Sequence, residues 1–231
     1  MNALTFGVTT IEVERYAATP TLALRVHIEE KTGTPVHTMA LRCQVRIDPQ
    51  RRGYSDSEAG ALLDLFDTRH RWQDTLRPFL WMHTSALVQG FTNSTEVSLP
   101  LALTYDLEVA AGKYLNAVRD GVIPLSLMFS GTAFMQGDNG FAIQQIPWDS
   151  DVSYHLPTQV WREAMDCFFP GSGWIRLPVE TLDRLSRFRV EQGLTNWAET
   201  LTALLDRAGT VDPTRDMLDG TIDDAATSSA R

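Results

Sequence analysis

The hydrophobic positions of the chain follow two different periods, which divide it into a strand-rich part and a helical part. Up to about residue 156, apolar residues alternate with polar ones, as in strands that bury one face. From residue 157 onward they recur about every 3.6 residues, as on the buried side of a helix. The pattern predicts an α+β protein with a β-rich part over 1–156 and a helical part over 157–208.

The alternating positions predict antiparallel strands that form either a sandwich-like core or a single curved sheet. The expected strands are residues 4–8, 22–28, 39–47, 79–88, 97–107, 124–133, 141–146 and 152–156. The Glu29–Pro35 turn predicts a hairpin between the second strand and the third, and the Gly137–Gly140 turn predicts another. Pro100 interrupts the clearest alternation, which indicates either an edge strand or a bulge, because proline cannot donate to a ladder.

Two helices are expected between the strands. Ser55 and Glu58 have the spacing of a capping box, which predicts a helix over residues 55–67. A second helix is expected over residues 109–120, followed by Gly121. Three helical stretches in the C-terminal part are expected to pack against the strands and to complete one domain.

Residues 1–208 are therefore expected to form a single α+β domain, and residues 209–231 an acidic tail. Residues 210–231 contain five aspartates and two arginines. Their few apolar side chains cannot offset the entropy lost on ordering, so we expect the tail to be disordered.

Composition restricts the class of protein and of partner. A chain of 231 residues, 43% of them hydrophobic, can bury a core without disulfides or metals. The net charge of −9 argues against a nucleic-acid binder, which needs excess Lys and Arg, and favours a protein partner. With no signal peptide and no apolar run of about 20 residues, we expect no membrane span and a cytoplasmic protein.

Arginines gather in one segment of this acidic chain. Residues 42–77 contain seven arginines, six acidic residues and no lysine, and arginine suits bidentate or stacked contacts at interfaces. The loop before the first helix is either a self-solvating polar loop or a corner that grips carboxylates, and Trp72 is either a core or an interface aromatic. The residues expected to bind a partner are Arg46, Arg51, Arg52, Tyr54, Arg69, Arg71 and Trp72.

No motif for catalysis, phosphate binding or metal binding is present in the sequence. His70 and His83, with Asp67 and Asp74, form the one plausible acid–base grouping, and no recognisable nucleophile accompanies them. The spacing of Asp149, Asp151 and His155 matches neither a zinc nor a calcium pattern, and Cys43 and Cys167 lack ligand-spaced neighbours. We therefore expect no catalytic residue, metal site or cofactor, and a protein that is not an enzyme.

Four segments carry a resemblance that extends from residue 4 to about 205. They are RIDPQRRGYSDSEAGALLDLFDTRHRW, DGVIPLSLMFSGTAF, QIPWDSDVSYHLP and PGSGWIRLPVETLDRL. They resemble a family of uncharacterised actinobacterial proteins, classed as a domain of unknown function, whose members are often encoded beside uptake [NiFe] hydrogenases. The resemblance implies an accessory or assembly role and supplies no catalytic residues.

Two hypotheses of function follow. The first is a non-enzymatic accessory or adaptor protein that binds a protein partner, such as a hydrogenase subunit or maturation factor, through the arginine- and aromatic-rich surface. The alternative is a chaperone similar to SecB that binds unfolded chains on an apolar groove of its sheet. A chaperone suppresses the aggregation of unrelated unfolded proteins, whereas an adaptor selects one folded partner.

Overall fold

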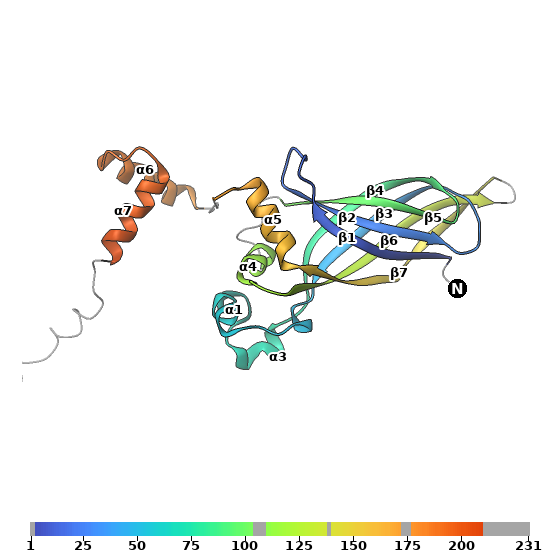
Figure 1. Cartoon of the computed structure of the whole chain (residues 1–231), viewed down its shortest axis with the longest axis horizontal. Helices are drawn as coiled ribbons and strands as arrows, with labels where there is room; N and C mark the ends of the chain where they lie inside the picture. The colour runs from blue at the N-terminus through green and yellow to red at the C-terminus, as the bar shows by residue number, and fades with distance from the viewer. Residues whose placement is uncertain (1–2, 104–109, 138–139, 172–176, 210–231) are drawn as a thin grey trace, which may run out of the picture. The chain divides into compact units, whose positions relative to one another are not determined.

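The computed structural model describes residues 3–103, 110–137, 140–171 and 177–209, without the side chains of Trp148 and Asp149. By its contacts the chain divides into two compact units, Met1–Ile175 and Arg176–Arg231. The strands belong to the first unit (Figure 1). The predicted tail, the end of the predicted strand 97–107 and the tip of the turn at 137–140 lie outside the described residues. The single domain expected over 1–208 stays a prediction.

The first unit contains two antiparallel sheets, which confirms the predicted α+β class and makes the core a sandwich. Sheet A has the order β1-β2-β5 and consists of β1 (Leu4–Val13), β2 (Thr21–Glu30) and β5 (Ser94–Ala102). Sheet B has the order β4-β3-β6-β7 and consists of β4 (Phe79–Phe91), β3 (Val36–Ile47), β6 (Val122–Gly137) and β7 (Gly140–Pro157). Strand β5 pairs with β2 at the edge of sheet A, which is one of the two positions that Pro100 indicated.

The core lies between the two sheets and is built from the alternating residues. Phe6 of β1 stacks on Phe129 of β6, with ring centroids 4.8 Å apart, so the inner faces of the sheets meet. The residues of β2 and β3 that alternate toward this core are buried: Leu22, Leu24, Val26, Ile28, Leu41, Cys43, Val45 and Ile47. The intervening residues of β3, Arg42, Gln44 and Arg46, lie on the outer face of sheet B.

The hairpin predicted at residues 29–35 is wrong, because the chain crosses there from one sheet to the other. Strand β2 pairs with β1 and β5, whereas β3 pairs with β4 and β6. The glycine at this turn, Gly33, has a φ of +76° and fits the tight bend, but a tight bend does not fix which strand pairs with which.

Glu30 organises this crossover. Its buried carboxylate accepts hydrogen bonds from the backbone N–H groups of Thr32 and Thr34, at 3.0 and 2.9 Å, and from the Thr32 hydroxyl at 2.6 Å. Burial alone would raise the pKa of Glu30, but these hydrogen bonds outweigh it and lower the pKa below its ordinary value of 4.5. The charged carboxylate therefore stabilises the turn.

Replacing Glu30 by glutamine is expected to lower the free energy of unfolding by about 1–3 kcal/mol at pH 7, because bonds to a buried charged acceptor are lost. Since the folded pKa of Glu30 is depressed, its contribution is fully present above pH 4.5 and is lost as the pH falls through the folded value. Urea unfolding at pH 7 and below pH 4.5 checks this, with the exposed neighbour changed in Glu29→Gln as control. An equal loss at both pH values would contradict the role of the charge.

Short helices cover one end of the sandwich, below and beside α5 in Figure 1. They are η1 (Pro49–Arg51), α1 (Asp56–Ala61), α2 (Leu63–Phe66), η2 (Arg69–Arg71), α3 (Trp72–Thr75) and α4 (Ala110–Ala117). The predicted capping box is confirmed, because the Ser55 side chain accepts from the Glu58 N–H while the Glu58 side chain accepts from the Ser55 N–H. The helix predicted over 55–67 is divided at Leu62, and the one predicted over 109–120 ends at Ala117.

Strand β7 is continuous, so the prediction of two separate strands over residues 141–146 and 152–156 is wrong. The register against β6 shifts between Phe129, opposite Ser150, and Gly131, opposite Ile146. Pro147 lies within this irregular stretch of an edge strand, so its missing N–H removes no hydrogen bond from the ladder.

The second unit contains two described helices of equal length, α6 (Val179–Glu191) and α7 (Trp197–Gly209). Arg189 lies 4.3 Å from the ring centroid of Trp197, and Arg207 lies 5.1 Å from that of Phe188, so cation–π contacts join the two helices. The preceding helix, α5 (Thr158–Phe168), belongs to the first unit, where it contacts β1 and β7.

Candidate functional site: an arginine corner and the outer face of sheet B

A buried ion pair fixes the short helices to the end of the sandwich. The Arg52 guanidinium donates to a Glu58 carboxylate oxygen at 2.9 Å, and the two side chains are only 10 and 6% exposed. Arg52 also donates to the backbone oxygen of Asp120, and Glu58 accepts from the backbone N–H groups of Ser55 and Arg119. Segments more than 60 residues apart in sequence therefore meet at this pair.

The pKa of Glu58 follows from these contacts. Burial would raise it, but the hydrogen bonds from the backbone of Ser55 and Arg119, together with the charge of Arg52, lower it. The carboxylate is thus ionised wherever the fold is intact near neutral pH. Its role here is structural, since its oxygens are occupied by protein donors.

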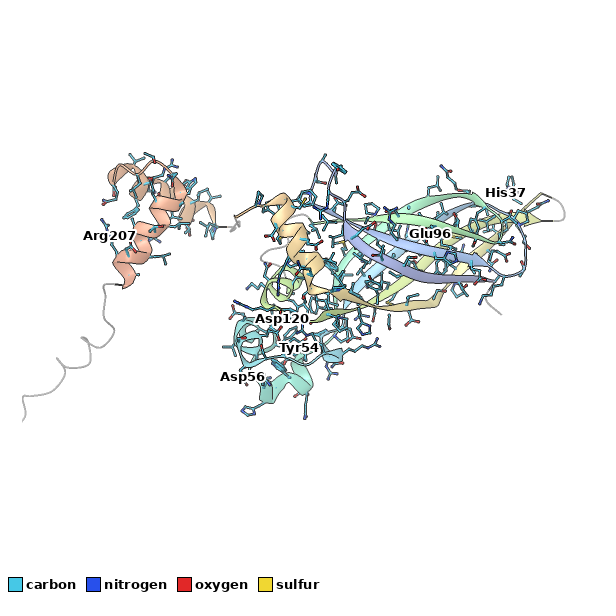
Figure 2. The ribbon with its side chains drawn as sticks, viewed as in Figure 1. His37, Tyr54, Asp56, Glu96, Asp120 and Arg207 are labelled. Carbon is cyan, nitrogen blue, oxygen red and sulfur yellow. The ribbon has the colours of Figure 1, made fainter. Side chains whose placement is uncertain are left out.

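Aromatic side chains continue this framework. The hydroxyl groups of Tyr54 and Tyr114 are 2.8 Å apart, and the Tyr54 hydroxyl donates to the backbone oxygen of Pro49 at 2.7 Å. Burial raises the pKa of both tyrosines, so both hydroxyls keep their protons at neutral pH. Trp72 meets the Tyr54 ring edge to face and donates its indole N–H to the backbone oxygen of Asp67. In Figure 2, Tyr54 and Asp120 lie near each other at this end, and His37 lies at the other end of the strands.

Three of the predicted arginines are exposed around this framework. The side chains of Arg51, Arg69 and Arg71 are between 48 and 64% exposed. Each donates to an aspartate of the same region: Asp48, Asp56 and Asp67, respectively. Arg69 also lies over the ring of the half-buried Trp72, 5.4 Å from its centroid. We call Arg51, Arg69, Arg71 and Trp72 the arginine corner.

The structure thus divides the seven predicted residues into three groups. Arg52 and Tyr54 belong to the buried framework, four residues form the arginine corner, and Arg46 is half-buried on β3, where it donates to the backbone oxygen of Pro78. Arg51 joins the corner to sheet B by donating to the Ser153 hydroxyl of β7 at 2.9 Å.

The outer face of sheet B was not predicted as a site beyond Arg46. A groove of about 560 Å³ crosses it, lined by Arg42, Gln44, His83, Ser85, Met128 and Ser130 among others. Toward the far end of the strands, three apolar side chains are widely exposed: Leu87 (73%), Phe141 (75%) and Ile143 (67%). The alternation of Phe141 and Ile143 with the residues between them was a sequence signal for one shared face, but nothing in the sequence indicated that this face is exposed.

The described residues bring together no group of three or more His, Cys, Asp and Glu side chains that could hold a metal ion. His70 lies in η2 and His83 on the outer face of β4, and Asp151 and His155 are exposed on β7. Burial raises the pKa of the Cys43 thiol to about 12, which keeps it unreactive. None of the helices in the described ranges is long and apolar enough to cross a membrane.

Fold and surface together define a two-sheet sandwich with an arginine corner at one end and an apolar surface on sheet B. The chain belongs to the family of unknown function DUF6084, which matches residues 1–213. No curated protein matches it.

Among solved structures, the chain is similar to Spo0M, a sporulation control protein from Bacillus subtilis, with 12% identity over 68% of this chain and 49% of that one, at a TM-score of 0.27. It is also similar to a β-glucosidase from Kluyveromyces marxianus, with 8% identity over 66% of this chain and 14% of that one, at a TM-score of 0.26. The chain therefore spans about half of Spo0M and a small part of the glucosidase, and neither likeness carries a statement about activity.

Proposed function

We propose that this chain is a non-enzymatic adaptor that binds an acidic protein partner in the cytoplasm through the arginine corner. The observation that carries the proposal is the construction of the corner. A buried framework, centred on the pair of Arg52 and Glu58, fixes the backbone from which Arg51, Arg69 and Arg71 extend into solvent. A preorganised cluster of arginines beside an aromatic ring is typical of protein interfaces.

The intramolecular partners of these arginines do not oppose docking. The contacts of Arg69 with Asp56 and of Arg71 with Asp67 are surface ion pairs, and such pairs contribute only about 0–1 kcal/mol each in water. The third pair joins the exposed Arg51 to the buried Asp48. Carboxylates of a partner can therefore replace or share the contacts of Arg69 and Arg71 at little cost, and the exposed Arg51 can share its own. Because the whole chain has a net charge of −9, a negatively charged partner binds more favourably at the arginine corner than elsewhere on the chain.

Affinity capture from the native cells tests the proposal. The tagged chain is compared with the triple variant Arg51→Glu, Arg69→Glu, Arg71→Glu and with a matched control, Arg15→Glu, Arg25→Glu, Lys31→Glu, whose residues are exposed beside or within β1 and β2. We expect a partner retained by the wild type and the control to be reduced at least about tenfold by the corner variant. If the corner variant retained every partner at the wild-type level, this result would contradict the proposal.

The finer form of the proposal is a role in the assembly of uptake [NiFe] hydrogenases, and it is supported by the resemblance to the actinobacterial family. It predicts that hydrogenase subunits or maturation factors are among the proteins lost by the corner variant. A captured partner with no relation to hydrogenases would reject this finer form and leave the adaptor role standing.

A chaperone similar to SecB is the second candidate, and the exposed Leu87, Phe141 and Ile143 favour it. A chaperone of that kind should prevent the aggregation of an unrelated unfolded protein at near-stoichiometric ratio. An adaptor should leave the light scattering of the unfolded protein unchanged.

A further inference from the structure

The outer face of sheet B has an apolar half at the end away from the short helices. Strand register places Leu87 opposite Ala40, and it places Phe134 opposite Ile143 on the neighbouring strand. Phe141 lies two residues before Ile143 on β7, so both side chains are on the same face of the sheet. We call Ala40, Leu87, Phe134, Phe141 and Ile143 the apolar strip. Thr132 lies opposite Ala40 and Thr38 opposite Phe134, so the strip runs diagonally across the strands. Exposed apolar side chains that gather on one face of a sheet are typical of an interaction surface.

The same face has a cationic half directly beside the apolar strip. Arg42 follows Ala40 by two residues on β3, about 7 Å along the strand, and Arg46 lies about 13 Å further on. Arg42 is exposed at the groove that His83, Ser85 and others line. Asp151 of β7, opposite Met128, is an exposed acidic residue on this face toward the β7 edge.

The cationic half is continuous with the arginine corner. Ser153, which accepts the hydrogen bond from Arg51, lies opposite Ser126 of β6, and Ser126 lies opposite Arg46 of β3. A ligand that contacts the corner can therefore extend along the face over Arg46 and Arg42 and reach the apolar strip without crossing an edge of the sheet.

We propose that this face binds one extended segment of the partner in which acidic residues adjoin apolar ones. The acidic part lies over Arg42 and Arg46, and the apolar part lies on the strip that contains Leu87 and Ile143. The proposal rests on the proposed function, whose arginine corner it extends. Charge complementarity favours this segment over a second copy of the chain. If two copies paired these faces with their strands parallel, the arginines of one copy would meet those of the other. If the strands were antiparallel, the arginines would meet the leucine and isoleucine of the other copy.

A synthetic peptide provides a defined probe. A labelled peptide with four acidic residues, a glycine and four alternating Leu and Phe residues spans about 30 Å when extended, which matches the distance from Arg46 to the end of the strip. It is made in both block orders, because the direction of binding is open. One control peptide has serine in place of Leu and Phe, and another has lysine in place of the acids.

Fluorescence anisotropy is measured on the whole chain and on four variants. Arg42→Glu and the pair Leu87→Ser, Ile143→Ser alter the two halves of the face, and their controls are Arg25→Glu on β2 and the exposed Tyr16→Ser. We expect each face variant to weaken binding of the acidic–apolar peptide at least about tenfold, with the controls unchanged and both control peptides at least about tenfold weaker. Unchanged binding to either face variant would overturn the proposal.

Two other occupants of this face would give different results. Equal binding of the lysine peptide would show a surface for unfolded apolar chains. A dimer in light scattering that the pair Leu87→Ser, Ile143→Ser dissociates would show a second copy of the chain. Either result would overturn the proposal.

Capture of the native partner separates the two proposals. If the corner variant loses the partner while the face variants retain it, the extension along sheet B fails and the adaptor role stands. If the face variants lose it and the corner variant retains it, the arginine corner fails instead.

Discussion

Replacement of Glu58 by alanine is expected to lower the free energy of unfolding by about 3–5 kcal/mol, because it leaves the buried guanidinium of Arg52 without its carboxylate. The backbone N–H groups of Ser55 and Arg119 also lose their acceptor, so α1 loses its capping box and the contact with the end of α4. Urea unfolding at pH 7 measures the loss. The exposed Glu163→Ala on α5 is the control and should change stability by no more than about 0.5 kcal/mol.

A double-mutant cycle separates the ion pair from the remaining contacts of Glu58. In Glu58→Gln and in Arg52→Met, one partner of a buried pair stays behind, whereas the double variant removes both charges. The double variant should therefore lose clearly less stability than the sum of the single variants. Additive losses would show that the two side chains do not depend on each other.

The pH dependence of the same variants has a definite sign. The folded pKa of Glu58 lies below its ordinary value of 4.5, so its contribution is present above pH 4.5 and is lost as the pH falls through the folded value. The stability of Glu58→Gln should therefore fall less steeply than that of the wild type as the solution is acidified below pH 4.5.

Gly131→Ala is expected to destabilise the sandwich by about 3 kcal/mol or more, or to prevent folding. The backbone of Gly131 has a φ of +141°, which other residues rarely adopt, and an added Cβ would overlap the carbonyl oxygen of Ala40 on the neighbouring β3. The overlap is with backbone at the centre of sheet B, so no side chain can move to relieve it. Thermal unfolding followed by far-UV circular dichroism measures the effect.

Gly60→Ala is the matched control for this substitution. Gly60 lies in α1, and an added Cβ there meets nothing within 4 Å. Alanine should therefore stabilise the helix by about 0.5–1 kcal/mol. A Gly131→Ala protein as stable as the wild type would mean that β3 and β6 do not approach each other as closely as the register at this position requires.

The sequence was informative where structure depends on neighbours along the chain. Alternation predicted the strands and their buried faces, Pro100 predicted an edge or a bulge, and Ser55 with Glu58 predicted a capping box. The turn after Glu30 was assigned to a hairpin because the local signal for a tight bend is the same whether the next strand stays in the sheet or crosses to another. That choice depends on the faces that pack together across the whole core.

In the candidate site, too, the local sequence did not show which single residues would be buried by distant segments. Arg51 and Arg52 are adjacent and chemically identical, yet the first is exposed and the second is buried in an ion pair. The difference comes from segments more than 60 residues away, where the backbone oxygen of Asp120 accepts from Arg52 and the backbone N–H of Arg119 donates to Glu58. The apolar strip was missed for a related reason, since an alternating pattern identifies a face but not what covers it.

The most direct test of the adaptor role is calorimetric titration of the captured partner into the wild-type chain and into the variant Arg51→Glu, Arg69→Glu, Arg71→Glu, at low and at high salt. Contact through exposed arginines predicts that reversal weakens binding at least about a hundredfold at low salt, and that the wild-type affinity falls as salt screens the charges. The same affinity and the same salt dependence in both proteins would contradict the account.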